Sequence, residues 1–328
     1  MSEPPKIVEG IVAAYHLDGK GGGLPLQQSD LQTLDTQQGL LWLHLDYTSE
    51  FTRQWLSESS GLDSVICDAI LADETRPRCM SSQGGLLITL RGINHNPGAD
   101  PEDMVSVRVW ISQNLIITTR RRRLLIFDDI IESLKSGNGP TSAGEFLVTT
   151  TDLLAKKMAD VIDNIDDAVD DLEEKVLTEE SYQLRSQIAD IRRQIISLRR
   201  YLSPQREAMT RLYSEQYELL SEKDRMKLRE VADRTMRYVE DLDSARERAS
   251  VTQEELGSRL AEQMNKRMYV LSIVAAIFLP LGFLTGLLGI NVGGIPGAEN
   301  KSAFFDFTII LATIVILQII IFKWKKWM

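Results

Sequence analysis

The stretch Tyr269–Asn291, YVLSIVAAIFLPLGFLTGLLGIN, most constrains how this chain can fold. It carries no charged residue, and about 20 apolar residues in a helix are enough to cross the hydrocarbon core of a bilayer. Lys266 and Arg267 stand immediately before it. We therefore expect a membrane-spanning helix here.

One face of this expected helix is a stripe that narrows from large side chains to bare backbone. Its members are spaced three or four residues apart, so they share one side of a helix. The stripe consists of Met268, Leu271, Ala275, Leu279, Gly282, Gly286 and Gly289. Small residues let helices pack closely. They equally fit a pore lining, in which glycines leave room and carbonyl groups face a cation. The residues alone leave both interpretations open.

The remainder of the chain looks like a soluble domain. Charged residues make up 26% of the 328 residues, yet few lie beyond Arg267. The N-terminal sequence MSEPPKIVEG has no apolar core region, so we expect no signal peptide and a cytoplasmic location for most of the chain. Cys67 and Cys79 are too few for a disulfide framework. The net charge of −10 argues against a nucleic-acid partner.

Short apolar runs predict an α/β domain at the N-terminus. We expect strands at 7–17, 40–47, 86–93, 104–110 and 115–119, two short helices between 48 and 71 that break at Gly61, and a turn at Glu74–Cys79. Because the strands mostly follow one another in sequence, the sheet should be largely antiparallel or mixed.

Long helical patterns follow. Phe146–Leu177 and Ser181–Leu202 each carry an apolar face and should pair as an antiparallel hairpin. Pro204 should bend or end the second helix. We expect Ser221–Gly289 to form one helix on the order of 100 Å long at about 1.5 Å per residue. The apolar stripe of its first part, from Leu228 to Leu260, should contact other copies of the chain.

A second apolar segment, Phe307–Phe322, can also span a bilayer. Lys323, Lys325 and Lys326 follow it, while the connecting loop Val292–Ser302 holds only one Lys and one Glu. Positive residues favour the cytoplasmic side, so both termini should lie in the cytoplasm and the loop outside.

No pattern in the sequence indicates an enzyme or a resident cofactor. His16, His44 and His95 are scattered, and none has the spacing of a zinc cage. DGKGGG lacks the spacing of a phosphate-binding loop. The segment 160–180 holds ten acidic residues, which either concentrate divalent cations or form a solvated helix face. We leave the residues of any metal site unassigned.

The residues Gly289-Ile290-Asn291, placed between two apolar spans, resemble the Gly-Met-Asn motif of the CorA superfamily of divalent-metal transporters. GLLGINVGGIPG, Thr75–Arg78 (TRPR) and Arg199–Glu207 (RRYLSPQRE) are similar to the ZntB zinc-transporter branch. The resemblance implies a funnel-shaped homopentamer in which five first spans line one pore. It places Gly289, Ile290 and Asn291 at the outer mouth, with the stripe from Gly286 to Met268 beneath them.

The resemblance also implies a function. Ile290 in place of methionine favours zinc, with cadmium, nickel or cobalt as companions, moving partly hydrated through a pore in a bacterial inner membrane. Uptake coupled to protons and export both stay open, and the outer loop offers Glu299 as its acidic residue. The alternatives are a CorA-type magnesium channel and, in a different class, a membrane-anchored cytoplasmic scaffold.

We therefore expect seven parts along the chain. They are a cytoplasmic α/β domain (1–135), a cytoplasmic helical hairpin (136–220), the stalk part of the long pore helix (221–268), the pore-lining span (269–291), a periplasmic loop (292–303), the second span (304–322) and a basic cytoplasmic tail (323–328).

Overall fold

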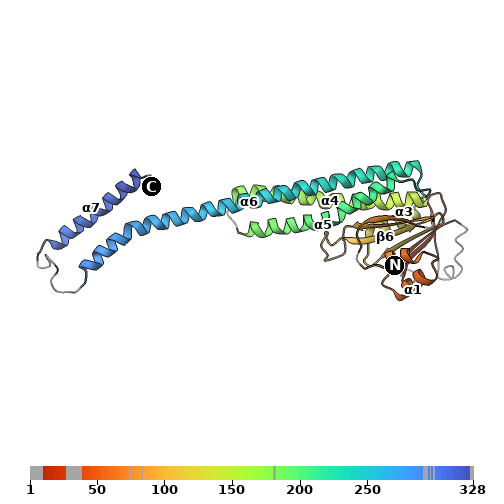
Figure 1. Ribbon diagram of the computed structural model, residues 1–328, viewed down its shortest axis with the longest axis horizontal. Coiled ribbons are helices and arrows are strands. Elements are labelled where there is room, and N and C mark those ends of the chain that lie inside the picture. The colour runs from red at the N-terminus through yellow and green to blue at the C-terminus, as the bar shows by residue number, and fades with distance from the viewer. Residues whose placement is uncertain are drawn as a thin grey trace. The chain divides into compact units, whose positions relative to one another are not determined.

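The computed structural model of the protein describes residues 10–26, 39–73, 75–82, 84–179, 182–290, 295, 297 and 300–325. The chain forms two compact units, Met1–Gln253 and Glu254–Met328. Figure 1 shows the elements of each unit.

Within the described residues, the first unit contains one mixed sheet of seven strands in the order β2-β1-β3-β7-β6-β5-β4. The strands are β1 (Ile11–Leu17), β2 (Gly23–Pro25), β3 (Leu40–Asp46), β4 (Arg78–Ser82), β5 (Gly85–Gly92), β6 (Val105–Ile111) and β7 (Leu115–Arg120). The pair β3–β7 is parallel, and the other pairs are antiparallel. The predicted mixed sheet is thus confirmed. The predicted turn at Glu74–Cys79 is wrong at its end, because Arg78 and Cys79 begin the edge strand β4.

Helices cover both faces of this sheet. Leu41, Leu43 and Leu45 of β3 pack in one cluster with side chains of α1 (Glu50–Glu58) and α2 (Ser64–Leu71). Trp42, on the opposite face of the same strand, packs with side chains of α3 (Leu125–Lys135) and α4 (Ala143–Thr178). Successive side chains of β3 point to opposite faces of the sheet, so this strand contributes to two hydrophobic cores. The two short helices that the sequence predicts are confirmed.

Three long helices, α4, α5 (Gln183–Ser214) and α6 (Glu222–Leu288), follow on the side of the sheet that carries Trp42. The hairpin of α4 and α5 matches the predicted antiparallel pair. The first part of α6 lies against α4, where Tyr238 donates a hydrogen bond to the carbonyl of Ala155 at 3.1 Å. Arg199 of α5 pairs with Asp243 of α6 at 2.5 Å. These contacts make the start of α6 part of a three-helix bundle.

The prediction that the first part of α6 contacts other copies of the chain through its apolar stripe is wrong. The stripe of α6 from Leu228 to Ala249 is buried within its own chain, because α4 and α5 supply the apolar faces that cover it. Of the two effects predicted for Pro204, a bend or an end of the helix, the structure excludes the end, because α5 runs on to Ser214. The buried side chain of Gln205 accepts a hydrogen bond from the amide of Arg91 at 2.7 Å.

Candidate functional site

Among the described residues, two helices are long and apolar enough to cross a membrane. One is α6, through its C-terminal part, and the other is α7 (Ala303–Trp324). Both belong to the second unit over their apolar lengths. Their apolar side chains are largely exposed in the single chain, as expected of helices that need lipid or other protein around them.

The half-buried residues of each apolar helix fall on one face. On α6 they are Ile273, Ile277, Pro280, Leu281 and Leu284. On α7 they are Ala303, Phe307, Leu311, Ile314, Val315 and Gln318, followed by the buried Phe322. Steps of three and four residues place each set on one side of its helix. A hydrogen bond between Gln318 and the carbonyl of Ala276 joins the two helices. These are therefore the faces that α6 and α7 turn toward each other.

The predicted pore-lining stripe lies on the opposite side of α6. Met268, Leu271, Ala275, Leu279, Gly282, Gly286 and Gly289 are all exposed in the single chain. Leu279 is 72% exposed. At about 3.6 residues per turn, this stripe is half a turn away from the half-buried face that contains Ile273 and Ile277. The second span thus leaves the stripe uncovered.

The glycines of the stripe differ in how much room the surrounding atoms leave for a side chain. Apart from the neighbouring backbone of the helix itself, a Cβ atom at Gly282 or Gly286 would meet no atom of the described residues within 4 Å. A Cβ atom at Gly289 would lie 2.7 Å from the carbonyl oxygen of Thr285. The amide of Gly289 donates to that same carbonyl at 2.9 Å and to the carbonyl of Gly286 at 3.2 Å, just after α6 ends at Leu288. Gly289 is therefore needed by the helix end, whereas packing within the chain does not require the other two.

The remaining motif residues are only partly described. Ile290 is 51% exposed. Asn291 and Glu299, which we predicted at the outer mouth, lie outside the described residues.

Comparison with known proteins decides the family. The family model described as "CorA-like Mg2+ transporter protein" matches residues 37–326. This chain belongs to the CorA-like transporter family. It is 40% identical over 306 residues to the zinc transport protein ZntB of Pectobacterium carotovorum, covering 93% of this chain and 92% of the relative. It is 38% identical over 328 residues to the divalent cation transporter CmaX of Pseudomonas aeruginosa, covering 97% of each chain.

A solved structure shows the same architecture. The structure of the full-length CmaX protein superposes on this CorA-like chain with a TM-score of 0.85 at 36% identity, covering 99% of this chain and 100% of the other. An N-terminal α/β domain, a long helix and a C-terminal apolar helix are thus the shared fold. The resemblance that the motifs suggested is confirmed.

The acidic segment 160–180 of this CorA-like chain is partly neutralised by basic side chains of the same chain. Arg248 of α6 contacts Asp166, Asp170 and Glu173 of α4, and Lys175 pairs with Asp171 at 2.5 Å. Over the part of the chain that the structure describes, no three His, Cys, Asp or Glu side chains are grouped to hold a metal ion. The packing of α4 against α6 therefore uses several of these carboxylates.

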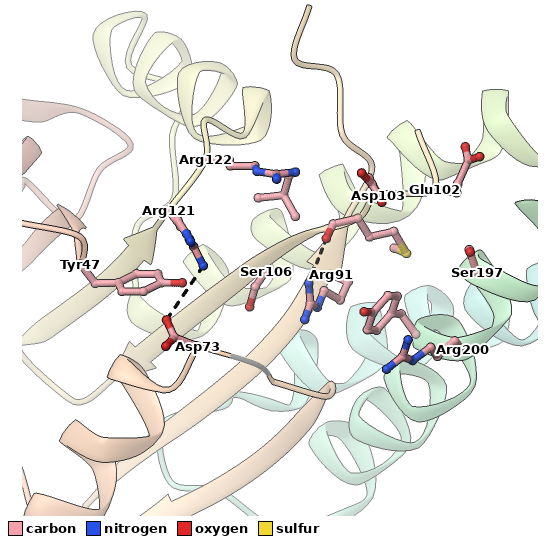
Figure 2. Close-up of a pocket in the computed structure, with 13 residues that line it drawn as sticks. Tyr47, Asp73, Arg91, Glu102, Asp103, Ser106, Arg121, Arg122, Ser197 and Arg200 are labelled. Atoms are coloured by element: carbon pink, nitrogen blue, oxygen red, sulfur yellow. Dashed lines mark hydrogen bonds and ion pairs between the residues drawn. The ribbon is translucent and has the colours of Figure 1, made fainter. Parts of the chain in front are cut away.

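A cleft of about 320 Å³ lies beside the sheet, and Figure 2 shows its lining. Arg91 is held there by the carbonyls of Met104 at 2.9 Å and Thr75 at 2.8 Å. Its guanidinium stacks over the ring of Tyr201 at 4.4 Å. Four arginines and three carboxylates contribute to the lining. Because guanidinium groups repel cations, this cleft does not have the character of a metal site.

His44 is a structural residue in the described fold. Its side chain is 2% exposed, and Nδ1 lies 2.8 Å from Oγ1 of Thr118. Burial, with the charge of Arg120, lowers the pKa of His44 to about 3. Asp46, the next residue on this face of the strand, instead accepts hydrogen bonds from Thr48. His44 and Asp46 therefore bond to different partners and do not form a metal or catalytic site together.

Sequence reasoning missed the bond between the two spans. Gln318 is an amide within a run of apolar residues, and Pro280 follows Ala276 by one helical turn. Together these two features could have indicated a tie between the helices, because a proline frees the carbonyl four residues before it.

Proposed function

We propose that this chain is a divalent-metal transporter of the inner membrane with zinc as its main cargo. The first span, the apolar part of α6, lines the ion path, and α7 stands outside it. The observation that carries the proposal is the position of the small-residue stripe. It lies on the side of α6 opposite the face that α7 covers, and it is exposed along its whole length in the single chain.

A single stripe cannot enclose an ion path, so the proposal requires several copies around an axis. A homopentamer would place five stripes around one pore, as the resemblance to the superfamily implies. The open space at Gly282 and Gly286 is consistent with this arrangement, since no described side chain lies within 4 Å of a Cβ atom at either position. The face of α6 that α7 covers is then directed outward.

The stripe carries no carboxylate, which bears on how the ion moves. A divalent cation is strongly hydrated, and neutral ligands return little of the cost of removing its water. We expect the ion to pass with at least part of its water shell. Carbonyl groups at the end of α6 and the side chain of Asn291 would contact that shell at the outer mouth.

Zinc is favoured by two observations. Ile290 replaces the methionine of the magnesium-type motif, and a protein described as a zinc transporter is 40% identical over 93% of this chain. Cadmium, nickel and cobalt are expected as companions. The alternative in the same class is a magnesium channel, which the family description favours. Any coupling to protons is a separate question that the same assay answers.

Metal flux into proteoliposomes that contain the purified protein tests the proposal. Zinc and magnesium uptake would be followed with a fluorescent indicator, with and without a pH gradient. We expect zinc flux well above that of protein-free liposomes and above magnesium flux. Faster zinc flux on imposing a gradient would indicate proton coupling. Magnesium flux alone would favour the channel, and no flux of either metal would favour a membrane-anchored scaffold.

A further inference from the structure

Pro280 lies inside α6, within its apolar part. Proline has no amide hydrogen, so the carbonyl of Ala276, four residues earlier, loses its usual partner in the helix. In water such a carbonyl would be solvated. In a bilayer core an unpaired backbone group costs several kcal/mol, so a partner must come from elsewhere.

Gln318 of α7 supplies that partner. Its Nε2 atom lies 3.3 Å from the carbonyl oxygen of Ala276. Only the nitrogen end of the amide can donate to a carbonyl, which fixes how this side chain is turned. Oε1 of Gln318 is buried and has no hydrogen-bond partner among the described residues. The oxygen end of the amide is thus enclosed, while the nitrogen end joins the two helices.

The other uncharged polar side chains of α7 behave differently. Thr308 and Thr313 donate to carbonyls of their own helix, each at 2.8 Å. Such bonds hold nothing outside α7. Gln318 instead bonds to α6, so it joins the two helices, which neither threonine does.

We infer that Gln318 is a positioning residue for the ion path. Its amide takes over the hydrogen bond that Pro280 removes, and it thereby fixes the angle between the parts of α6 before and after the proline, at the level of Ala275 and Leu279. This inference rests on the proposed function, because it gives the bond a role in transport. Proline positions are where helices bend. The segment beyond Pro280 carries Gly282 and Gly286, so this angle sets where those glycines stand in the path.

A double-mutant cycle on the full-length protein tests the inference. Gln318→Leu removes the donor, and Pro280→Ala restores an amide hydrogen at position 280 that can bond the carbonyl of Ala276 within α6. The double variant carries both changes. Two sites that act through one bond are non-additive, whereas independent sites are additive. Thr313→Val is the matched control, because it removes a polar group whose bond stays within α7.

Two readouts separate the parts of the inference. The first is the midpoint of thermal unfolding of the protein in detergent. The second is the maximal zinc flux at matched protein density, measured apart from the zinc concentration that gives half-maximal flux. Gln318→Leu should lower the midpoint and reduce maximal flux roughly threefold to tenfold, the scale of one hydrogen bond between membrane helices. The half-maximal concentration should change little, since the amide does not contact the ion.

In the Pro280→Ala background, Gln318→Leu should change neither readout by more than Thr313→Val does. Equal losses in both backgrounds would overturn the inference, because the amide would then act on something other than the carbonyl of Ala276. A Gln318→Leu protein that unfolds and transports like the parent would also overturn it. Failure of the proposed function looks different: the parent itself would carry no metal, while the unfolding midpoints would still show whether the amide and Pro280 are coupled.

Discussion

Nη1 of Arg248, on α6, lies 2.8 Å from Oδ1 of Asp166, on α4. The same guanidinium also contacts Asp170 and, at 2.9 Å, Glu173. Hydrogen bonds to Glu173 and Asp170 raise the pKa of Arg248 above its ordinary value. A single arginine thus holds three carboxylates on successive turns of the neighbouring helix.

Replacing Arg248 with methionine should destabilise the packing of α4 on α6. Three carboxylates would then face one another without their shared cation. Because the groups are partly exposed, we expect a loss of about 1 kcal/mol in the free energy of unfolding. Chemical denaturation of the protein in detergent measures it. Arg193→Met is the matched control, since its partner Asp190 lies on the same helix. Equal losses for both variants would show that the contact between the helices adds nothing.

The buried His44 predicts a dependence of stability on pH. Its pKa is about 3 in the folded chain and about 6.5 when unfolded. The unfolded state therefore binds more protons between these values, so stability is full above about pH 6.5 and falls as the pH drops. The expected slope approaches 1.4 kcal/mol per pH unit. His44→Phe keeps an aromatic ring but cannot titrate, so its slope between pH 6.5 and 5 should be flatter. An unchanged slope would mean that another group is responsible.

The orientation in the membrane can be tested with introduced cysteines. Cys67 and Cys79 are buried, and burial raises the pKa of both thiols, that of Cys79 to about 11, so neither should react quickly at neutral pH. In intact spheroplasts, Lys301→Cys should react with an impermeant thiol reagent from the periplasmic side. Lys20→Cys should react only after the membrane is permeabilised. The reverse pattern would place the loop in the cytoplasm.

The order of elements could be predicted because apolar periodicity identifies strands and helices directly. β3 alternates Leu41, Trp42 and Leu43 between two cores, and its neighbours show similar patterns. The edge strands were harder. β2 contains only Gly23–Pro25, and β4 begins directly after Pro77, residues that are typical of turns. Pairing with a neighbouring strand, which a local pattern does not reveal, decides their structure.

The partners of the apolar faces could not be predicted. The periodicity of α6 identifies a buried face between Leu228 and Ala249, but it does not say whether another copy or the same chain covers it. In the apolar spans the stripe was visible in the sequence, whereas the side facing α7 was not. That side contains Ile273 and Ile277, which differ little from the lipid-facing residues in chemistry. The hydrogen bond of Gln318 to the carbonyl of Ala276 depends on how the two helices pack, which a local sequence pattern does not show.

Asn291 should matter through its polar amide. In the proposed assembly a ring of such amides, with nearby carbonyls, holds the water shell of the ion without stripping it. Asn291→Leu should assemble normally and lose most zinc flux, because leucine has a similar volume but no polar group. If Asn291 only ends the helix, Asn291→Gly should transport normally, since glycine serves well just past a helix end. Zinc flux of both variants at matched protein levels decides between the roles. Normal transport by both would exclude the mouth ring.

Asn291→Asp provides a second measurement at the same position. A ring of carboxylates binds divalent ions more tightly than a ring of amides, so this variant should keep metal binding and change the preference among zinc, magnesium and cobalt. Competition between metals in the flux assay measures the preference. The same order of preference as in the parent would indicate that the ions do not approach this residue.

Zinc flux through Gly286→Val tests most directly whether the uncovered stripe of α6 lines the ion path. No described side chain packs against a Cβ atom at this position, so the variant should fold and insert normally. Ala312→Val, on an exposed position of α7, is the matched control. We predict that Gly286→Val, at the same assembled level as the parent, loses nearly all zinc flux while Ala312→Val keeps it. Parental zinc flux through Gly286→Val would contradict the placement of this stripe in the pore.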